Sequence, residues 1–314
     1  MPRERPCGSA KSTHFRASTT HPNKVCPLTR IVRAASMRNA PARFLMCPPD
    51  HYAVAYSINP WMDPATWSQN DRALAKAARQ EWVALRRTLL ALGATVELVP
   101  PVRGLPDLVF TANSAVVLDG KALVARFRHP ERKGEEPHYE AALRALAARE
   151  FLTSVATLPP GVVLEGAGDC VWDAARNLFW MGHGPRSDLA ARSVVEDTFG
   201  VEVVALELAD PRFYHMDTAL SALPGGELMY VPSAFTAEGR AEIAARSTAA
   251  ERIPIADHNA GRLAANTVCV GDTLVMPGCG DDLRETLEAR GYRVTVVPLP
   301  EFLRSGGAAF CLTL

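Results

Sequence analysis

The sequence lacks several features that would assign it to a common functional class. Its 34 basic and 34 acidic side chains cancel, so no net charge favours nucleic acid or an anionic membrane. No apolar run approaches the roughly 18 residues that a transmembrane helix needs. The seven cysteines lack the C-x-x-C spacing of zinc sites, and no G-x-G-x-x-G follows the first predicted strand. These absences disfavour membrane, nucleic-acid-binding, structural-zinc and dinucleotide-binding proteins.

The composition indicates an ordinary globular protein of a reducing compartment. Hydrophobic residues make up 48% and charged residues 22% of the chain. An odd number of cysteines without tight spacing argues against a disulfide framework. We therefore expect a cytoplasmic protein.

Residues 1–40 differ from the rest of the chain. They contain eight Lys or Arg residues and a single acid, Glu4, separated by Ser, Thr and Pro. Such a segment is either a transit peptide, an unstructured extension, or the result of a start codon placed ahead of the natural one at Met37. We expect a disordered or wrongly included extension over residues 1–40 and a single domain over residues 41–314.

From residue 43 onward, predicted strands alternate with amphipathic helices. The first unit is expected to contain a strand over 44–47, an irregular loop to about 67, a helix over about 69–92 and a strand over 95–99. Four later units each begin with a predicted hairpin, over 114–125, 170–181, 219–231 and 266–276. Helices are expected over about 135–149, 187–199, 237–247 and 281–290, and strands over 201–208 and 292–297.

A hairpin, a helix and a strand return every 50 residues or so, which is about the upper end of known repeat periods. This recurrence indicates an internal repeat. Five units are counted if residues 310–314 form a strand that completes the first. Repeats of this size favour radial packing around an axis, as in propellers, over an open doubly wound sheet. We therefore expect an α/β fold of the five-bladed propeller type with pseudo-fivefold repeats.

Polar residues interrupt the apolar pattern ahead of three hairpins. They are Asp107 and Asn113 before the first, Glu165 and Asp169 on a glycine-rich stretch before the second, and His215 and Asp217 before the third. His215 and Asp217 are expected on one side of an extended strand, because alternate residues of a strand face the same way. Equivalent points of a radial repeat face one axis, so Asn113, Glu165 and His215 should converge there. The glycine-rich loop ahead of Cys311 is expected at the same axis.

A thiol, an imidazole and carboxylates are the parts of a nucleophilic catalyst. Taken singly, each residue also has a structural explanation, such as a small buried hydrophobe for Cys311. Several carboxylates around a nucleophile favour a cationic substrate, whereas Arg128, Arg132 and Arg186 offer donors that suit a substrate carboxylate. The expected substrate carries a guanidinium at one end and a carboxylate at the other, as arginine does.

Four ordered motifs resemble those of the guanidino-group-modifying, or amidinotransferase, superfamily. They are Asp107-x-x-Phe110-x-x-Asn113, Glu165-Gly-Ala-Gly-Asp169, His215-x-Asp217 and Gly306-Gly-x-x-x-Cys311-x-Thr313, within about residues 43–314. The superfamily includes dimethylarginine dimethylaminohydrolases, arginine deiminases, arginine dihydrolases and glycine amidinotransferases. The resemblance implies a five-bladed α/β propeller, the pentein fold, and a reaction that needs no cofactor and no metal ion.

The resemblance also implies a role for each matching residue. Cys311 would be the nucleophile that forms a covalent thiouronium intermediate, and His215 the general acid and base. Glu165, a catalytic candidate, and Asp217 would bind the guanidinium. The remaining substrate-binding candidates are Arg132 and Arg186 for the substrate carboxylate, Asp107 as the acid that contacts substrate in dimethylaminohydrolases, and Asn113, Phe110, Asp169 and Asn59.

Two departures from the family pattern bear on the reaction. The Glu165 motif is one residue longer than the common Glu-Gly-Gly-Asp, which affects how Asp169 is oriented. Asn113 stands where deiminases and dimethylaminohydrolases have aspartate and arginine dihydrolases have asparagine. Its N–H can donate to the neutral ureido oxygen of citrulline, which ionised aspartate cannot do. Citrulline would then be retained and hydrolysed again.

The leading hypothesis is therefore a hydrolase that converts arginine to ornithine, carbon dioxide and ammonia. The alternative is a dimethylarginine dimethylaminohydrolase, which converts methylated arginine to citrulline and a methylamine. An amidinotransferase is disfavoured because nothing marks an acceptor site, and a non-catalytic arginine-binding protein because Cys311, His215 and Glu165 are all present. The expected partner is a small-molecule substrate, with no nucleic acid and no membrane, and a homo-oligomer is compatible with the sequence.

Overall fold

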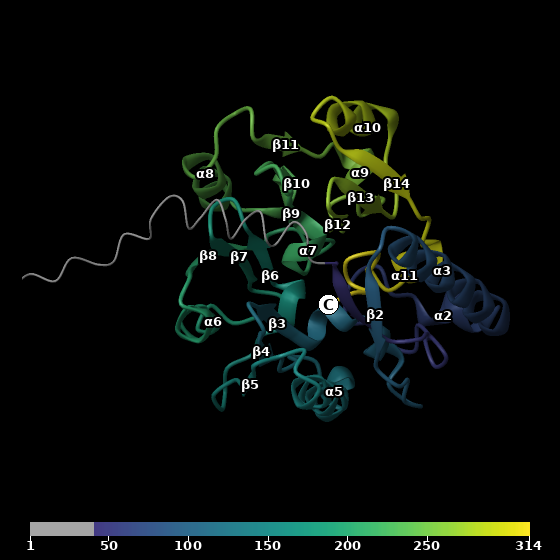
Figure 1. Ribbon diagram of the computed structural model, residues 1–314. Helices are drawn as coiled ribbons and strands as arrows, with labels where there is room; N and C mark the ends of the chain where they lie inside the picture. The colour runs from purple at the N-terminus through teal and green to yellow at the C-terminus, as the bar shows by residue number, and fades with distance from the viewer. Residues whose placement is uncertain (1–40) are drawn as a thin grey trace, which may run out of the picture. The chain divides into compact units, whose positions relative to one another are not determined.

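A computed structural model describes residues 41–314 (Figure 1). The extension predicted over residues 1–40 lies outside the described residues. The described part is an α/β structure in which five small sheets follow one another along the chain. Within it, no helix is long and apolar enough to cross a membrane.

The first sheet is a parallel pair of strands. β1 (Arg43–Met46) pairs with β2 (Thr95–Leu98), and α2 (Pro64–Ser68) and α3 (Asp71–Ala91) connect them. Ala78, Trp82, Leu85 and Leu89 form the buried face of α3, as their helical spacing predicts. Gly93 follows the helix at φ +86°, a left-handed conformation that favours glycine.

The other four sheets share one plan, an antiparallel hairpin, a helix, and a third strand parallel to the second. Their strands are β3 (Ala115–Leu118), β4 (Lys121–Val124) and β5 (Ser154–Thr157); β6 (Cys170–Asp173), β7 (Leu178–His183) and β8 (Glu202–Glu207); β9 (Leu220–Ala222), β10 (Leu228–Tyr230) and β11 (Arg252–Pro254); and β12 (Val268–Val270), β13 (Thr273–Met276) and β14 (Arg293–Val296). The helices between second and third strands are α5 (Glu136–Ala148), α6 (Ala191–Phe199), α8 (Ala237–Ala245) and α10 (Asp281–Glu288).

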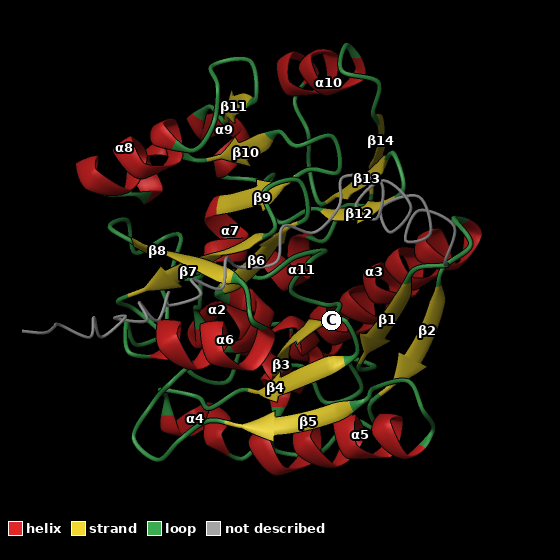
Figure 2. Cartoon of the chain, turned by 60° about the vertical axis from the view of Figure 1, so that its left-hand side comes forward, coloured by secondary structure: helices red, strands yellow, loops and turns green. Residues whose placement is uncertain are grey.

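Short helices fill several connections. They are α4 (Pro130–Lys133), α7 (Met216–Ala219), α9 (Asp257–Ala260) and α11 (Pro300–Leu303), with the 3-10 helices η1 (Pro106–Val109), η2 (Thr111–Ser114), η3 (Gly166–Gly168) and η4 (Pro232–Ala234). In each of the four three-stranded sheets, the first strand lies nearest the carboxyl terminus in Figure 1 and the third strand lies farthest from it. Figure 2, turned by 60°, shows α5 and α6 lying against the sheets whose second and third strands they connect.

The predicted hairpins and longer helices are present to within a few residues at each end. Two strands, β5 and β11, were not predicted from the sequence. Both are short and lie at the edge of their sheets, and β11 ends in Pro254. Proline is tolerated at a sheet edge but weakens the strand signal in a sequence. The alternative of an open doubly wound sheet is wrong, because no sheet among residues 41–314 has more than three strands.

The strand predicted over residues 310–314 is absent. Leu312 donates its N–H to Ala308 and Thr313 to Phe310, so the segment turns, and only Leu314 pairs with Leu45 of β1. The N–H groups of Phe310 and Cys311 instead bond to a side chain described below. These residues therefore cannot form a ladder.

The extended strand predicted to carry His215 and Asp217 is also wrong beyond its first residue. His215 is extended, with φ −121° and ψ 154°, but Asp217 lies in α7. The Asp169 carboxylate accepts the N–H of Met216, and Thr218 donates its N–H and its hydroxyl to the His215 carbonyl. These bonds satisfy the free groups of a helix start and favour the helical turn.

Candidate active site

The loop ahead of the terminal cysteine depends on two glycines. Gly306 has φ +74°, and a Cβ atom there would lie 2.7 Å from Trp61 and 2.8 Å from Tyr214. A Cβ atom on Gly307 would lie 2.5 Å from the ring of Phe110, which is buried. Only glycine therefore lets this loop pass so close to three aromatic rings.

Cys311 lies at the end of this loop, with 2% of its surface exposed. Its thiol donates to Oδ2 of Asp217 at 3.1 Å and accepts a hydrogen bond from Nδ2 of Asn266 at 3.0 Å. Burial and the neighbouring Asp217 carboxylate raise the pKa of the thiol well above its ordinary value. The free protein therefore holds a neutral thiol that needs a local cation or proton acceptor to ionise.

His215 forms a buried pair with Glu165. The ring Nε2 lies 2.8 Å from Oε2 of Glu165, and Arg186 donates to the same oxygen at 2.9 Å. Burial by itself raises the pKa of Glu165, but the Arg186 charge and the bond to His215 outweigh burial and hold that pKa well below its usual value. Burial lowers the pKa of His215 to about 4. The pair is thus an ionised carboxylate that orients a neutral imidazole at pH 7.

Asp169 lies beside this pair, and the protein already occupies both of its oxygens. The Ser187 hydroxyl donates to one oxygen and the N–H of Met216 to the other, at 3.1 Å. Burial raises the pKa of Asp169 well above its usual value. The structure therefore places this predicted substrate-binding residue where it fixes the start of α7.

Arg132 is buried against Glu135. Glu135 was not among the residues predicted from the sequence. Its Nε and Nη2 donate to the two oxygens of Glu135 at 3.0 and 2.8 Å, a bidentate ion pair. Nη1 donates to Oδ1 of Asn113 at 2.9 Å, and Nη2 also reaches the carbonyl oxygen of Asp107 at 3.3 Å. Arg132 is therefore anchored on three sides.

The bond from Arg132 fixes the orientation of the Asn113 amide. Because its oxygen accepts that bond, its Nδ2 faces the carbonyl oxygen of Glu165, at a long 3.5 Å. A Cβ atom on Gly168 would lie 2.1 Å from Nδ2, so glycine is needed there. The amide thus presents its donor side next to the Glu165–His215 pair.

Two buried carboxylates each keep an unpaired oxygen. Asp107 accepts a hydrogen bond from the Tyr56 hydroxyl at 2.9 Å on Oδ2, and Asp217 accepts the thiol of Cys311 on Oδ2. Within residues 41–314, Oδ1 of each has no hydrogen-bond partner. Burial raises the pKa of both groups, that of Asp217 to about 7. Such atoms are suited to receive N–H donors from a cationic ligand.

Asn59 connects the loop between β1 and α2 to the glycine-rich loop ahead of Cys311. Its Nδ2 donates to the carbonyl oxygen of Ser305 at 3.0 Å, and its Oδ1 accepts the N–H of Trp61 at 2.9 Å. Arg186 donates to the carbonyl oxygen of Ile58 in the same segment at 3.2 Å. The structure therefore places Asn59 at the junction of two loops that flank the site.

Asn266, Tyr56 and Glu135 contact the predicted residues but were missed in the sequence. A signal for Asn266 existed, because it precedes β12 by two residues as Asn113 precedes β3. Tyr56 lies in an irregular loop without a period, and Glu135 looks like an ordinary helix-start acid. Their positions follow only from the tertiary structure.

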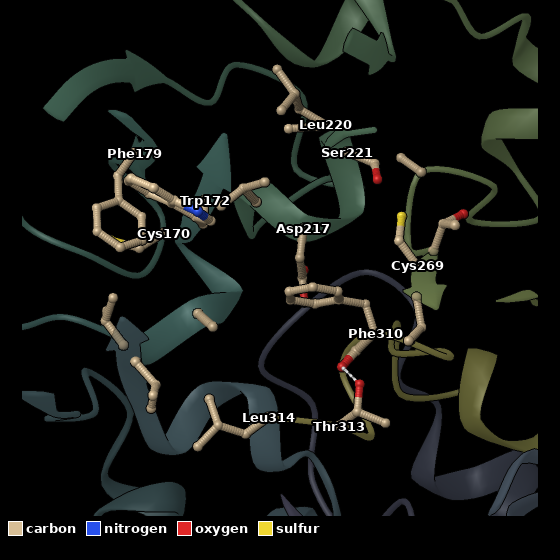
Figure 3. Close-up of a pocket in the computed structure, with 18 of the residues that line it drawn as sticks. Cys170, Trp172, Phe179, Asp217, Leu220, Ser221, Cys269, Phe310, Thr313 and Leu314 are labelled. Carbon is tan, nitrogen blue, oxygen red and sulfur yellow. Dashed lines mark hydrogen bonds between the residues drawn. The ribbon is translucent and has the colours of Figure 1, made fainter. Parts of the chain in front are cut away.

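A cavity of about 280 Å³ borders the site (Figure 3). The first hairpin strands supply much of its wall, through Val116, Val171, Leu220 and Val268. Asp217 and Phe310 both line this cavity (Figure 3), whereas Cys311 and His215 are not part of its lining. Across residues 41–314, no group of three His, Cys, Asp or Glu side chains is arranged to hold a metal ion.

Comparison with known families identifies the family of this chain. Residues 55–314 match the family model described as N,N dimethylarginine dimethylhydrolase, eukaryotic. The chain belongs to this family. The matched residues include every predicted site residue from Asn59 to Cys311.

Curated proteins that are similar to this chain have two named activities. The chain is 41% identical over 272 residues to the bifunctional arginine dihydrolase/ornithine cyclodeaminase ArgZ of Synechocystis, covering 87% of this chain and 37% of that protein. It is 36% identical to the N(G),N(G)-dimethylarginine dimethylaminohydrolase of Mycobacterium tuberculosis, covering 87% of this chain and 85% of that protein. The chain thus spans little more than a third of the length of ArgZ.

Solved structures resemble the family fold closely. The substrate-bound N-terminal domain of ArgZ superposes with a TM-score of 0.80 at 39% identity, covering 87% of this chain and 97% of that one. A dimethylarginine dimethylaminohydrolase bound to S-methyl-L-thiocitrulline superposes with a TM-score of 0.69 at 20% identity, covering 88% and 99%. The second likeness supports the α/β fold alone.

Proposed function

We propose that this chain is a cysteine-dependent hydrolase of the guanidino group of arginine, which forms ornithine, carbon dioxide and ammonia through a covalent thiouronium intermediate. The observation that carries the proposal is the unpaired, buried Oδ1 of Asp217 beside the thiol of Cys311. A guanidinium is planar and offers N–H donors in pairs, so it can satisfy this oxygen while its carbon approaches the sulfur. A solved ArgZ domain with a covalently bound reaction intermediate supports the same chemistry in a relative.

The proposed first half-reaction uses the substrate's own charge. A guanidinium next to Asp217 opposes the burial and the carboxylate that keep Cys311 protonated, so the thiol ionises in the complex and its proton passes to the neutral His215. The thiolate attacks the guanidino carbon, the bond to a terminal nitrogen breaks, and the protonated His215 gives its proton to the leaving ammonia. The carbon stays bound to sulfur, and Glu165 stabilises the transient imidazolium.

The second half-reaction hydrolyses the intermediate. Neutral His215 takes a proton from water, the water oxygen attacks the carbon, and the bond to sulfur breaks to give citrulline. We propose that Asn113 then holds citrulline for a second round, because its N–H side faces the pair while its oxygen is bonded to Arg132. The Cys311 thiolate then attacks the ureido carbon and the second ammonia leaves. Hydrolysis of the resulting intermediate releases carbon dioxide and ornithine.

For the substrate carboxylate we propose Arg132 and Arg186, as the motifs imply. Both guanidinium groups are buried, and each also bonds a glutamate, Glu135 or Glu165. A substrate carboxylate would share these arginines with the glutamates. We propose Asp107 for the polar end of the substrate, with Phe110 and Asn59 shaping the loops around it and Asp169 acting through α7.

A dimethylarginine dimethylaminohydrolase is the second candidate. The family description and the Mycobacterium tuberculosis relative, of which this chain covers 85%, favour it. The two activities differ in whether the substrate is methylated and whether citrulline is released. Asn113 favours the dihydrolase.

We also propose that residues 41–314 form one catalytic domain with the architecture of a five-bladed propeller. The five sheets in chain order and the repeated plan of four of them support this architecture. Five described cysteines, including Cys311, are free thiols, which supports a cytoplasmic location.

Product analysis tests the proposed function. Purified protein is incubated separately with arginine, citrulline and asymmetric dimethylarginine, with Cys311→Ser as the inactive blank. We expect ornithine from the first two substrates and no product from the third. Citrulline as the final product from arginine would overturn the dihydrolase, and turnover of dimethylarginine alone, with citrulline as product, would replace it by the second candidate.

A further inference from the structure

A buried asparagine outside the four motifs contacts the candidate nucleophile directly. Asn266 lies two residues ahead of β12 and is fully buried. Its Oδ1 accepts the N–H groups of Phe310 at 2.9 Å and Cys311 at 3.1 Å. Its Nδ2 donates to Sγ of Cys311 at 3.0 Å and to the carbonyl oxygen of Asp217 at 3.3 Å. One side chain thus contacts both the backbone and the sulfur of Cys311.

The backbone decides which end of this amide faces the sulfur. The orientation of an asparagine amide follows from its hydrogen-bonding network. Only the oxygen of Asn266 can accept the two backbone N–H groups, and the amino group then faces two acceptors, the sulfur and a carbonyl oxygen. A flipped amide would set N–H groups against N–H groups. The donor is therefore directed at the sulfur whether or not the thiol is ionised.

The groups around the thiol have opposite effects on its ionisation. The Asp217 carboxylate accepts the S–H and its charge opposes the thiolate, whereas the N–H of Asn266 favours the thiolate. Tyr214 is a further titratable side chain close to Cys311. When a cationic substrate neutralises Asp217, Asn266 remains as a donor held in place by the loop that carries the sulfur.

The repeat gives Asn266 the same place as other site residues. Asn113 precedes its hairpin strand by the same two residues, and Glu165 and His215 also lie just ahead of hairpin strands. The neighbours Ala265 and Thr267 line the cavity of Figure 3, whereas Asn266 bonds to Cys311. Each of the four hairpins is thus preceded by a polar side chain of the candidate site.

We propose that Asn266 is a positioning residue for Cys311. Asn266 holds the sulfur in place and stabilises the thiolate that attacks the guanidino carbon. The consequence for turnover rests on the proposed function. The effect on the thiol does not, and it can be measured without a substrate.

The test is the pH dependence of Cys311 alkylation by iodoacetamide, followed by mass spectrometry of the peptide that contains Cys311. Asn266→Asp keeps an oxygen for the two backbone N–H groups but puts an acceptor in place of the donor. We expect the alkylation midpoint to rise by at least about one pH unit, so the rate at pH 8 falls about tenfold or more. Asn266→Ala, which removes both functions, should shift the midpoint in the same direction.

The matched control is Asn259→Ala. Asn259 is also buried, and its amide bonds the N–H of Gly280 and the Asp282 carboxylate away from the thiol. This variant should lose stability but keep the wild-type alkylation profile. Circular dichroism identifies the folded variants, and Asn266→Ala replaces Asn266→Asp if the latter does not fold.

Turnover separates this proposal from the proposed function. With arginine as substrate, the Asn266 variants should lose at least about tenfold in kcat while KM stays within about threefold, because Asn266 bonds to the sulfur and to the backbone that carries it. A folded Asn266 variant with the wild-type alkylation midpoint and rate would overturn the proposal. Wild-type protein that alkylates as expected but converts no guanidino substrate would overturn the proposed function alone.

Discussion

At the scale of single residues, hydrogen-bond partners separate the acids that hold the site together from those that can receive a ligand. The oxygens of Asp169 are taken by Ser187 and Met216, whereas Asp107 and Asp217 each keep one buried oxygen without a partner within residues 41–314. An unpaired buried acceptor costs about 1–3 kcal/mol. The sequence could not make this distinction, because all three are acids ahead of hairpins and only the fold determines which donors surround them.

In the proposed function Asn113 retains citrulline for the second hydrolysis, and Asn113→Asp tests this. The change removes the N–H donor and puts a charge beside the ureido oxygen, while Arg132, 2.9 Å away, can pair with the new carboxylate. We expect citrulline to bind about tenfold to a hundredfold more weakly, equivalent to roughly 1.5–3 kcal/mol. Arginine should still bind, and citrulline should accumulate. Product chromatography over time measures the ratio of citrulline to ornithine.

Asn70→Asp is the matched control for this change. Asn70 is the exposed N-cap of α3, so the variant adds the same charge without touching the site. It should keep the wild-type product ratio. Ornithine formed by Asn113→Asp at the wild-type rate from citrulline would show that this amide does not retain citrulline.

Asp217 should make stability depend on pH in a defined direction. Burial raises its pKa to about 7, so the folded protein keeps a proton that the unfolded chain has lost. Its contribution to stability is complete below about pH 4 and is lost as the pH rises toward 7. Asp217→Asn removes the titration, so its free energy of unfolding relative to wild type should increase from pH 4 to pH 8 by about 3–4 kcal/mol. Urea unfolding at both pH values measures this, and an equal difference at both would contradict it.

At the scale of elements, periodic helices were predictable and irregular segments were not. The spacing of Leu74, Ala78, Trp82, Leu85 and Leu89 indicated both α3 and its buried face, although Leu74 is only half-buried. The carboxyl-terminal segment looked like a strand because its residues are apolar. It turns instead, because Asn266, 44 or 45 residues away in the sequence, takes the N–H groups that a strand would use. A side chain so distant gives no local signal.

Leu85→Ala tests the packing of α3. Leu85 is fully buried in the main hydrophobic core, so truncation leaves a cavity and should lower the free energy of unfolding by about 2–5 kcal/mol. Leu90→Ala in the same helix is the control, because Leu90 is 41% exposed and should cost no more than about 0.5 kcal/mol. Chemical denaturation of both variants provides the comparison. Equal losses would mean that α3 does not bury the face described.

At the scale of the whole molecule, the repeat was the most informative signal in the sequence. It predicted that residues far apart in the chain converge, and the bonds between Asn113, Glu165 and His215 and their neighbours agree with this. The count of hairpins was correct, but the first sheet has two strands and only Leu314 of the tail joins it. The repeat also held a signal for Asn266 that was missed in the sequence, and its partner atoms could be named only from the structure.

The last prediction concerns the extension. Every described sheet and every candidate site residue lies within residues 43–314, so deleting residues 1–36 should leave activity unchanged and the Tm within about 3 °C, equivalent to about 1 kcal/mol. Deleting residues 1–46 is the control. It removes β1, which pairs with β2. Leu45 of β1 also forms two backbone hydrogen bonds with Leu314, three residues after Cys311. This longer deletion should abolish activity and lower the Tm sharply. Thermal melting and arginine turnover of both proteins measure the difference, and a comparable loss from the shorter deletion would move the domain boundary upstream of residue 37.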